Sequence, residues 1–112
     1  MGQAIEIKSD NFEAEVANDS GVSLVDFGAT WCGPCQALAP TIDALAGEYE
    51  GRVKIGKCDV DQAQDLATKF GIMSVPTIIF FKGGEKVDSL LGNQPKEKLK
   101  EKIEELLASA NG

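Results

Sequence analysis

Short apolar strand patterns alternate with helical patterns along this chain, and this alternation constrains the fold more than any other feature. Strands are expected at residues 4–7, 22–27, 53–60, 77–81 and 86–91. The early strand–helix alternation implies parallel pairing, whereas the last two strands flank Lys82-Gly83-Gly84-Glu85 and form an antiparallel hairpin. The sequence therefore predicts an α/β fold, with a mixed sheet and helices on both of its faces.

Local signals set the helix boundaries. Asp10 followed by Glu13 resembles a capping box that starts a helix reaching about residue 18. A long helix ends near residue 49; Pro40 should kink it, and its core face is Leu38, Ile42, Leu45 and Tyr49. A short helix follows at residues 62–70 and ends at Gly71. Pro95 opens the last helix, whose apolar face is Leu99, Ile103, Leu106 and Leu107.

Length and charge narrow the class of protein. A chain of 112 residues suits one domain, and we expect residues 1–112 to form it. The net charge of −7 argues against binding to nucleic acid and to anionic membranes. The N-terminus shows no secretory signal, and the longest apolar stretch is too short to span a bilayer. A monomeric cytoplasmic protein is the expectation.

Three cysteines and no histidine limit the chemistry further. Three thiols cannot complete a standard zinc or iron–sulfur site within one chain. A structural disulfide between Cys32 and Cys35 would close too small a loop to stabilise the fold much. A Cys-x-x-Cys motif beside a βαβ pattern therefore favours redox chemistry over metal binding.

The Cys-x-x-Cys motif lies where a strand and loop lead into a helix. The free N–H groups and the dipole at that helix end favour a thiolate at Cys32, the species that attacks disulfides. Cys35, in the first turn, can then resolve the mixed disulfide. Gly33 allows close approach of a partner, Pro34 suits the first turn, and Trp31 offers an apolar contact.

Two charged residues fall in predicted buried strands. Asp26 should have a raised pKa and could exchange protons with the resolving thiol, although a strand-end acid bonded to loop backbone is the alternative. A lysine is uncommon inside a buried strand unless it is paired. Lys57 could pair with Asp26 across neighbouring strands, or its side chain could point to solvent. Cys58 should face the opposite side of the sheet from Lys57, as a small buried apolar residue.

A resemblance to the thioredoxin family rests on a long ordered set of residues. The matching positions are Asp26-Phe27, Trp31-Cys32-Gly33-Pro34-Cys35, Pro40, Lys57, Asp59-Val60-Asp61, Gly71-Ile72, Val75-Pro76-Thr77, Gly84 and Gly92. The resemblance implies the thioredoxin fold, a five-stranded mixed sheet flanked by four helices. Val75-Pro76-Thr77 alone would favour a trans proline, but the resemblance implies that Pro76 is cis.

The resemblance also implies a function. Cys32 would be the nucleophile and Cys35 the resolving thiol of a general protein-disulfide reductase, with Asp26 as a buried acid aided by Lys57. A substrate polypeptide would add along Val75 in the manner of a strand. The contact surface would also include Trp31, Gly33, Pro34, Met73 and Gly92. A flavin- and NADPH-dependent thioredoxin reductase would supply the electrons, so the chain itself would bind no cofactor.

Three positions depart from the common pattern of the family. Gly28 replaces an aromatic residue and should loosen packing behind the redox turn; Gln36 replaces a frequent Lys or Arg, and Asn93 a small apolar residue. Two alternative functions remain open at this point. One is an oxidant or isomerase of the same fold. The other is a redox-independent interaction module that uses the surface around Trp31 and Pro76.

Overall fold

The computed structural model describes residues 3–109 as a sheet of five strands with four helices. The elements, in chain order, are β1 (Ile5–Ile7), η1 (Glu13–Ala17), β2 (Val22–Gly28), α1 (Gly33–Glu48), β3 (Val53–Asp59), α2 (Gln64–Lys69), β4 (Thr77–Lys82), β5 (Glu85–Leu91) and α3 (Lys96–Ala108). The predicted number and order of strands and helices is confirmed.

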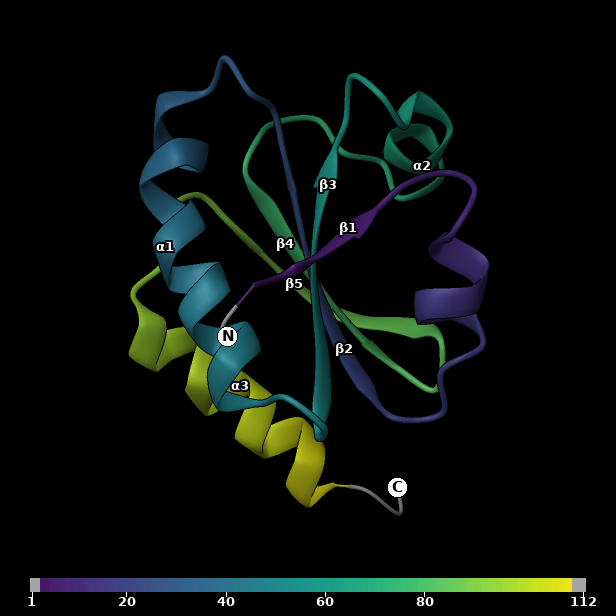
Figure 1. The fold of residues 1–112 in the computed structure, drawn as a ribbon, viewed down its shortest axis with the longest axis vertical. Coiled ribbons are helices and arrows are strands. Elements are labelled where there is room, and N and C mark those ends of the chain that lie inside the picture. Colours follow the sequence, from purple (N-terminus) through teal and green to yellow (C-terminus); the bar gives the residue numbers. More distant parts are fainter. Residues whose placement is uncertain (1–2, 110–112) are drawn as a thin grey trace.

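The sheet is mixed, as the sequence predicted. Its strand order is β1-β3-β2-β4-β5; β1 and β2 run parallel to β3, while β4 is antiparallel to both β2 and β5. Figure 1 shows α1 and α3 together on one side of the sheet, with α2 on the other. The carboxyl end of the central strand β2 leads directly into the loop before α1.

Each face of the sheet carries its own apolar core. Successive residues of a strand point to opposite faces, so Leu24 packs with α1 and α3 while Val25 packs with η1 and α2. The predicted core face of α1 is confirmed, because Leu38, Ile42, Leu45 and Tyr49 are all buried. On α3, Leu99 and Ile103 are fully buried, and Leu106 and Leu107 pack partly buried against the same core.

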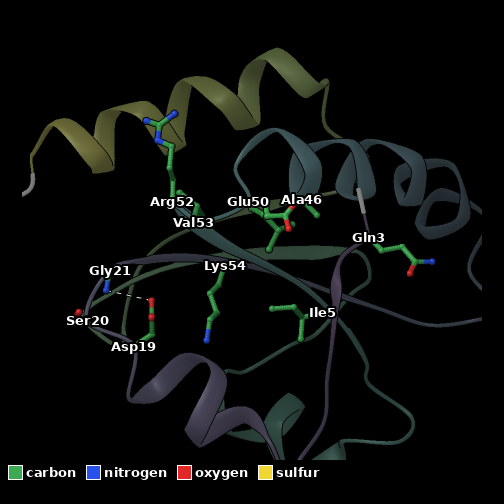
Figure 2. Close-up of a pocket in the computed structure, with 12 residues that line it drawn as sticks. Gln3, Ile5, Asp19, Ser20, Gly21, Ala46, Glu50, Arg52, Val53 and Lys54 are labelled. Carbon is green, nitrogen blue, oxygen red and sulfur yellow. Dashed lines mark hydrogen bonds between the residues drawn. The ribbon is translucent and has the colours of Figure 1, made fainter. Parts of the chain in front are cut away.

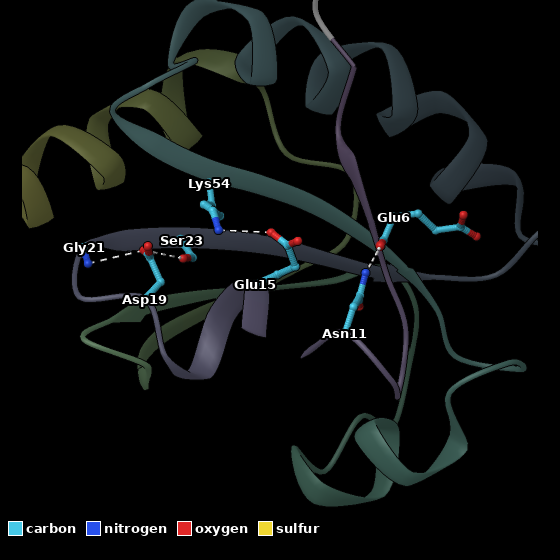
Figure 3. A network of polar contacts seen from close by, with 7 residues as sticks. All are labelled: Glu6, Asn11, Glu15, Asp19, Gly21, Ser23 and Lys54. Carbon is cyan, nitrogen blue, oxygen red and sulfur yellow. Dashed lines mark hydrogen bonds and ion pairs between the residues drawn. The ribbon is translucent and has the colours of Figure 1, made fainter. Parts of the chain in front are cut away.

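The first helix differs from the prediction. η1 is a π-helix, in which the Asn18 N–H donates to the Glu13 carbonyl at 2.9 Å, and no side chain caps its start. The capping box predicted for Asp10 and Glu13 is therefore wrong. Asn11 organises the preceding turn instead: its Oδ1 accepts from the Lys8 N–H at 2.6 Å, and its Nδ2 donates to the Glu6 carbonyl (Figure 3).

The start of α2 also differs from the prediction, by two residues. α2 begins at Gln64 rather than at residue 62, because the Asp59 carboxylate and carbonyl hold residues 59–62 in a turn. Pro40 lies inside α1 as predicted; the kink stays a prediction. None of the helices within residues 3–109 is long and apolar enough to cross a membrane.

The β4–β5 hairpin turns on two glycines with left-handed backbones, Gly83 (φ 61°) and Gly84 (φ 82°). This geometry fits the two-residue turns that match the twist of paired strands. Gly84 also has a packing role, because a Cβ at this position would overlap the carbonyl of Ala17 at the end of η1.

Candidate redox site

The Cys-x-x-Cys motif forms the start of α1. Cys32 is the N-cap residue, and it is joined to Cys35 by a disulfide with a Cα–Cα distance of 5.2 Å. The Cys35 N–H donates to Cys32 Sγ at 3.2 Å, while Pro34 has no N–H to satisfy. The sulfur of Cys32 therefore occupies the position in which a helix N-terminus stabilises negative charge.

The two cysteines are largely buried. Cys32 and Cys35 are 5% and 8% exposed, and they pack with Ala29, Val60 and Val75. Trp31 stands outside this cluster at 69% exposure, and its Nε1–H donates to the Asp61 carboxylate at 2.8 Å. The indole is thus held in place while most of its surface stays open to a partner.

The loop before β4 lies against Cys32. Cys32 Sγ is 3.7 Å from the Val75 carbonyl oxygen, and the Val75–Pro76 peptide bond is cis. The resemblance predicted this isomer correctly, whereas the tripeptide alone favoured trans. The loop is anchored by the Thr77 hydroxyl, which donates to the Ser74 carbonyl, and by the Gly92 N–H, which donates to the Pro76 carbonyl at 2.8 Å.

A groove of about 630 Å³ runs beside this loop. Trp31, Met73 and Val75 line it together with residues of α2, and Met73 is 94% exposed. A Cβ built on Gly33 meets no atom within 4 Å, so the backbone there is open to close approach. The structure thus brings Trp31, Met73 and Val75 to one surface, and ties Gly92 to it through Pro76.

Asp26 is a buried carboxyl on β2. The side chain is 4% exposed, and its Oδ1 has no hydrogen-bond partner within residues 3–109. Burial raises the pKa of Asp26 from 3.8 to about 6, and the positive charge of Lys57 opposes this rise. The prediction of a raised pKa is confirmed, and the alternative of an acid bonded to loop backbone is not what the structure shows.

Lys57 lies opposite Asp26 in the β2–β3 register, but its ion pair is made elsewhere. Its Nζ is 3.3 Å from Oδ1 of Asp43 on α1, and the same Oδ1 accepts from the Ala4 N–H at 3.0 Å. The predicted direct pairing with Asp26 is therefore corrected to an electrostatic influence. Asp43 was missed because it lies on another element, where only the folded chain brings it to Lys57.

Cys58 is separate from the redox pair. It is 2% exposed and packs among apolar residues on the face of the sheet covered by η1 and α2. Burial, with smaller contributions from nearby carboxylates, raises the pKa of the Cys58 thiol to about 12. The prediction of a small buried apolar residue is confirmed, and a thiolate is disfavoured there.

The departures from the family pattern have distinct surroundings. A Cβ built on Gly28 would lie 3.1 Å from Cys35 Sγ, and a hollow of about 470 Å³ opens beside it. Gln36 donates from Nε2 to the Thr30 carbonyl at 2.8 Å and so connects α1 to the loop that precedes it. The sequence analysis did not predict this hydrogen bond. Asn93 is exposed.

The hollow at the opposite end of the sheet has no cysteine among its lining residues. It has a volume of about 520 Å³ and lies near the starts of β2 and β3 (Figure 2), lined by charged residues such as Asp19, Glu50 and Arg52. Lys54 forms an ion pair with Glu15 of η1, with 3.0 Å between Nζ and Oε1 (Figure 3). Within the described part of the chain, no cluster of three or more Cys, Asp or Glu side chains could hold a metal ion.

Comparison with known proteins gives one consistent result. The thioredoxin family model matches residues 3–105. The chain is 50% identical over 103 residues to thioredoxin of Staphylococcus saprophyticus, covering 92% of this chain and 97% of that protein. It is 45% identical over 104 residues to thioredoxin 2 of Chlorobaculum tepidum, covering 93% and 95%. In structure it resembles a mutant thioredoxin from Halobacterium salinarum, with a TM-score of 0.85, 36% identity and coverage of 95% and 92%.

Proposed function

Because this chain belongs to the thioredoxin family and is a thiol–disulfide oxidoreductase that reduces protein disulfides, we propose that Cys32 is its attacking thiol and Cys35 its resolving thiol. The observation that carries this assignment is the asymmetry of the pair. Cys32 Sγ accepts the Cys35 N–H at the helix start and lies beside the Val75 loop, whereas Cys35 lies next to the buried acid.

The first step forms a mixed disulfide. The Cys32 thiolate attacks one sulfur of the substrate disulfide, a new S–S bond forms, and the other substrate sulfur leaves as a thiolate. The N–H groups and dipole at the start of α1 stabilise the attacking anion.

The second step releases the substrate. Cys35 attacks Cys32 Sγ, the second substrate sulfur leaves, and the Cys32–Cys35 disulfide forms. Cys35 must lose its proton for this attack, and Asp26 is the nearby acceptor. The two groups face the same space, because a Cβ placed on Gly28 would lie 3.1 Å from Cys35 Sγ and 3.8 Å from Asp26 Oδ1. Its pKa of about 6 leaves it largely ionised at neutral pH and able to take a proton. Lys57 assists by favouring the ionised carboxylate.

The substrate polypeptide lies along the loop at Val75 and the cis proline Pro76, with backbone hydrogen bonds in the manner of an added strand. Trp31 and Met73 supply exposed apolar surface beside this loop. Gly33, Pro34 and Gly92 border it with little side-chain bulk. This arrangement presents the substrate disulfide to Cys32 without requiring a particular side-chain sequence.

Family membership also indicates the general partners, which are disulfide-containing proteins and a thioredoxin reductase. For this chain in particular, we propose a single-domain monomer in the cytoplasm that binds no nucleic acid, no membrane and no cofactor of its own. Its charge of −7 supports the first two of these exclusions. Electrons would arrive from the flavin and NADPH of the reductase.

Insulin reduction by dithiothreitol tests the assignment of the cysteines. The intact protein should accelerate it, and Cys35→Ser should abolish turnover by leaving mixed disulfides on Cys32 unresolved. Cys58→Ser is the matched control, because it removes a buried thiol outside the redox pair. Full turnover by the Cys35→Ser variant would overturn the resolving role. Retention of the biological role by both Cys32→Ser and Cys35→Ser would instead favour the interaction module.

A further inference from the structure

The hollow of about 470 Å³ beside Cys35 is distinct from the substrate groove. We call it the Gly28 hollow; its lining includes Asp26, Gly28, Ala29, Cys35, Ala39 and Lys57. Cys35 and the buried Cys58 line it and Cys32 does not, and it shares no lining residue with the groove at Trp31 and Val75. Its volume falls within the range of small-molecule sites. A small ligand there would meet the second cysteine without entering the substrate groove.

Gly28 keeps this approach open. A Cβ there would lie 3.1 Å from Sγ and 3.3 Å from Cβ of Cys35, distances tighter than ordinary van der Waals contact. The same point is 3.8 Å from Asp26 Oδ1, so the sulfur and the carboxyl both border the space that a side chain would fill. Ala29 and Ala39 add only methyl groups to the walls. Any larger residue at position 28 would occupy this space.

Charge selects what the Gly28 hollow can take. Three acids line it, Glu6, Asp26 and Asp59. Lys57 is the cation among the lining residues, and it is already paired with Asp43 at 3.3 Å. Asp26 is 4% exposed with an unpartnered Oδ1, a buried acceptor that a cationic donor would satisfy. The lining therefore favours cationic guests over anionic ones.

We propose that the Gly28 hollow admits low-mass disulfides with ammonium ends, and that these react there directly with Cys35. The proposal rests on the proposed function, because it uses the same thiol pair. The Cys35 thiolate attacks one sulfur of the small disulfide, and one small thiolate leaves. The Cys32 thiolate then attacks Cys35 Sγ, the second small thiolate leaves, and the Cys32–Cys35 disulfide forms. Two electrons pass to the small disulfide, and the two cysteine protons end on the two small thiols.

The test isolates Cys35. In a Cys32→Ser background, second-order rate constants are measured with cystamine (two ammonium groups), hydroxyethyl disulfide (neutral) and dithiodiglycolate (two carboxylates). Because the thiol released from cystamine is more acidic and leaves faster, each rate constant is divided by that of the same disulfide with mercaptoethanol. Electrostatic focusing in a charged cleft predicts that this ratio is larger for cystamine than for dithiodiglycolate by on the order of tenfold or more. The Cys32→Ser, Cys35→Ser double variant measures any contribution of Cys58.

Filling the hollow separates this site from the general acidity of the protein. Gly28→Trp in the same background should lower the cystamine rate by on the order of tenfold and reduce its advantage over dithiodiglycolate. Gly21→Ala is the matched control, since its Cβ would meet Asp19 Oδ2 at an ordinary 3.6 Å at the other end of β2. Gly28→Ala is used where circular dichroism shows that the Trp variant has not folded.

The outcomes distinguish the two proposals. Equal cystamine rates in folded Gly28 variants and their parent, or no preference for the cationic disulfide, would overturn the Gly28-hollow proposal. Insulin reduction by the intact protein that requires both Cys32 and Cys35 would leave the proposed function standing in that case. Failure of insulin reduction, with Cys35 still selective for cystamine through the hollow, would instead overturn the proposed assignment and leave the hollow reaction intact.

Discussion

Replacing Asp26 by Asn tests how much stability the fold loses by burying an acid beside its redox pair. The side chain is 4% exposed and has an unpartnered carboxyl oxygen, so ionisation in the folded state occurs without the solvation available in the unfolded chain. Asn has almost the same shape and cannot ionise. The substitution therefore removes the charge while keeping the volume of the side chain.

The magnitude follows from the rise in the pKa of Asp26 from 3.8 to about 6. One pKa unit corresponds to about 1.4 kcal/mol, so ionising this group at pH 7 costs the folded state about 3 kcal/mol relative to the unfolded state. Because the folded pKa is the higher one, the native state binds more protons between these two values. The stability contribution is therefore fully present below pH 3.8 and is lost as pH rises through about 6.

Urea unfolding of the oxidised protein and of Asp26→Asn, at pH 7 and at pH 3.5, measures this directly. The variant should be more stable by about 3 kcal/mol at pH 7, and the difference should largely vanish at pH 3.5. Asp10→Asn, at an exposed turn position, is the control and should show no comparable gain. A variant no more stable than the parent at pH 7, or a gain that persists at pH 3.5, would refute the reasoning.

Three further predictions test other parts of the structure. Lys57→Met should raise the pKa of Asp26 above about 6, because it removes the positive charge that lowers this pKa. Carboxyl carbon NMR measures the pKa, and an unchanged pKa of Asp26 would contradict the influence of Lys57. Gly84→Ala should lower the free energy of unfolding in urea by about 1–3 kcal/mol through backbone strain, and further through a clash with Ala17. The matched Gly83→Ala has the strain without the clash, so equal losses in the two variants would contradict the clash. Leu38→Ala should lower the free energy of unfolding by about 2–5 kcal/mol in the same assay, far more than Val87→Ala at a half-exposed position. Comparable losses in the two variants would contradict the place of Leu38 in the core.

The order of strands and helices was predictable because each element has its own local spacing of apolar residues. Leu24 and Val25 are neighbours in sequence, and the alternation of a strand is enough to send them to opposite cores. Helical spacing identified the buried face of α1 in the same way. The position of Cys32 at a helix start also follows from local pattern, since a strand and a loop precede a helical segment.

Contacts between distant elements could not be predicted in this way. Lys57 was expected to pair with Asp26, its neighbour across the sheet, but side-chain reach and the packing of α1 give it Asp43 instead. The choice of Asn11 over Asp10 at the first turn depends on which side chain reaches a free backbone N–H. The cis isomer at Pro76 came from the family resemblance, because local sequence alone leaves both isomers accessible.

The proposed division of labour between the cysteines follows from where the helix begins. Because Cys32 is the N-cap, its sulfur receives a backbone N–H and lies against the Val75 loop, at the surface where a polypeptide can add. One helical turn later, Cys35 lies next to Gly28 and the buried acid Asp26. In the proposed mechanism, the fold thus gives the attacking sulfur a means of stabilising charge and the resolving sulfur a proton acceptor. Gly28 adds a second approach from outside, so the residue at this one position decides whether Cys35 reacts only with Cys32 or also with small molecules.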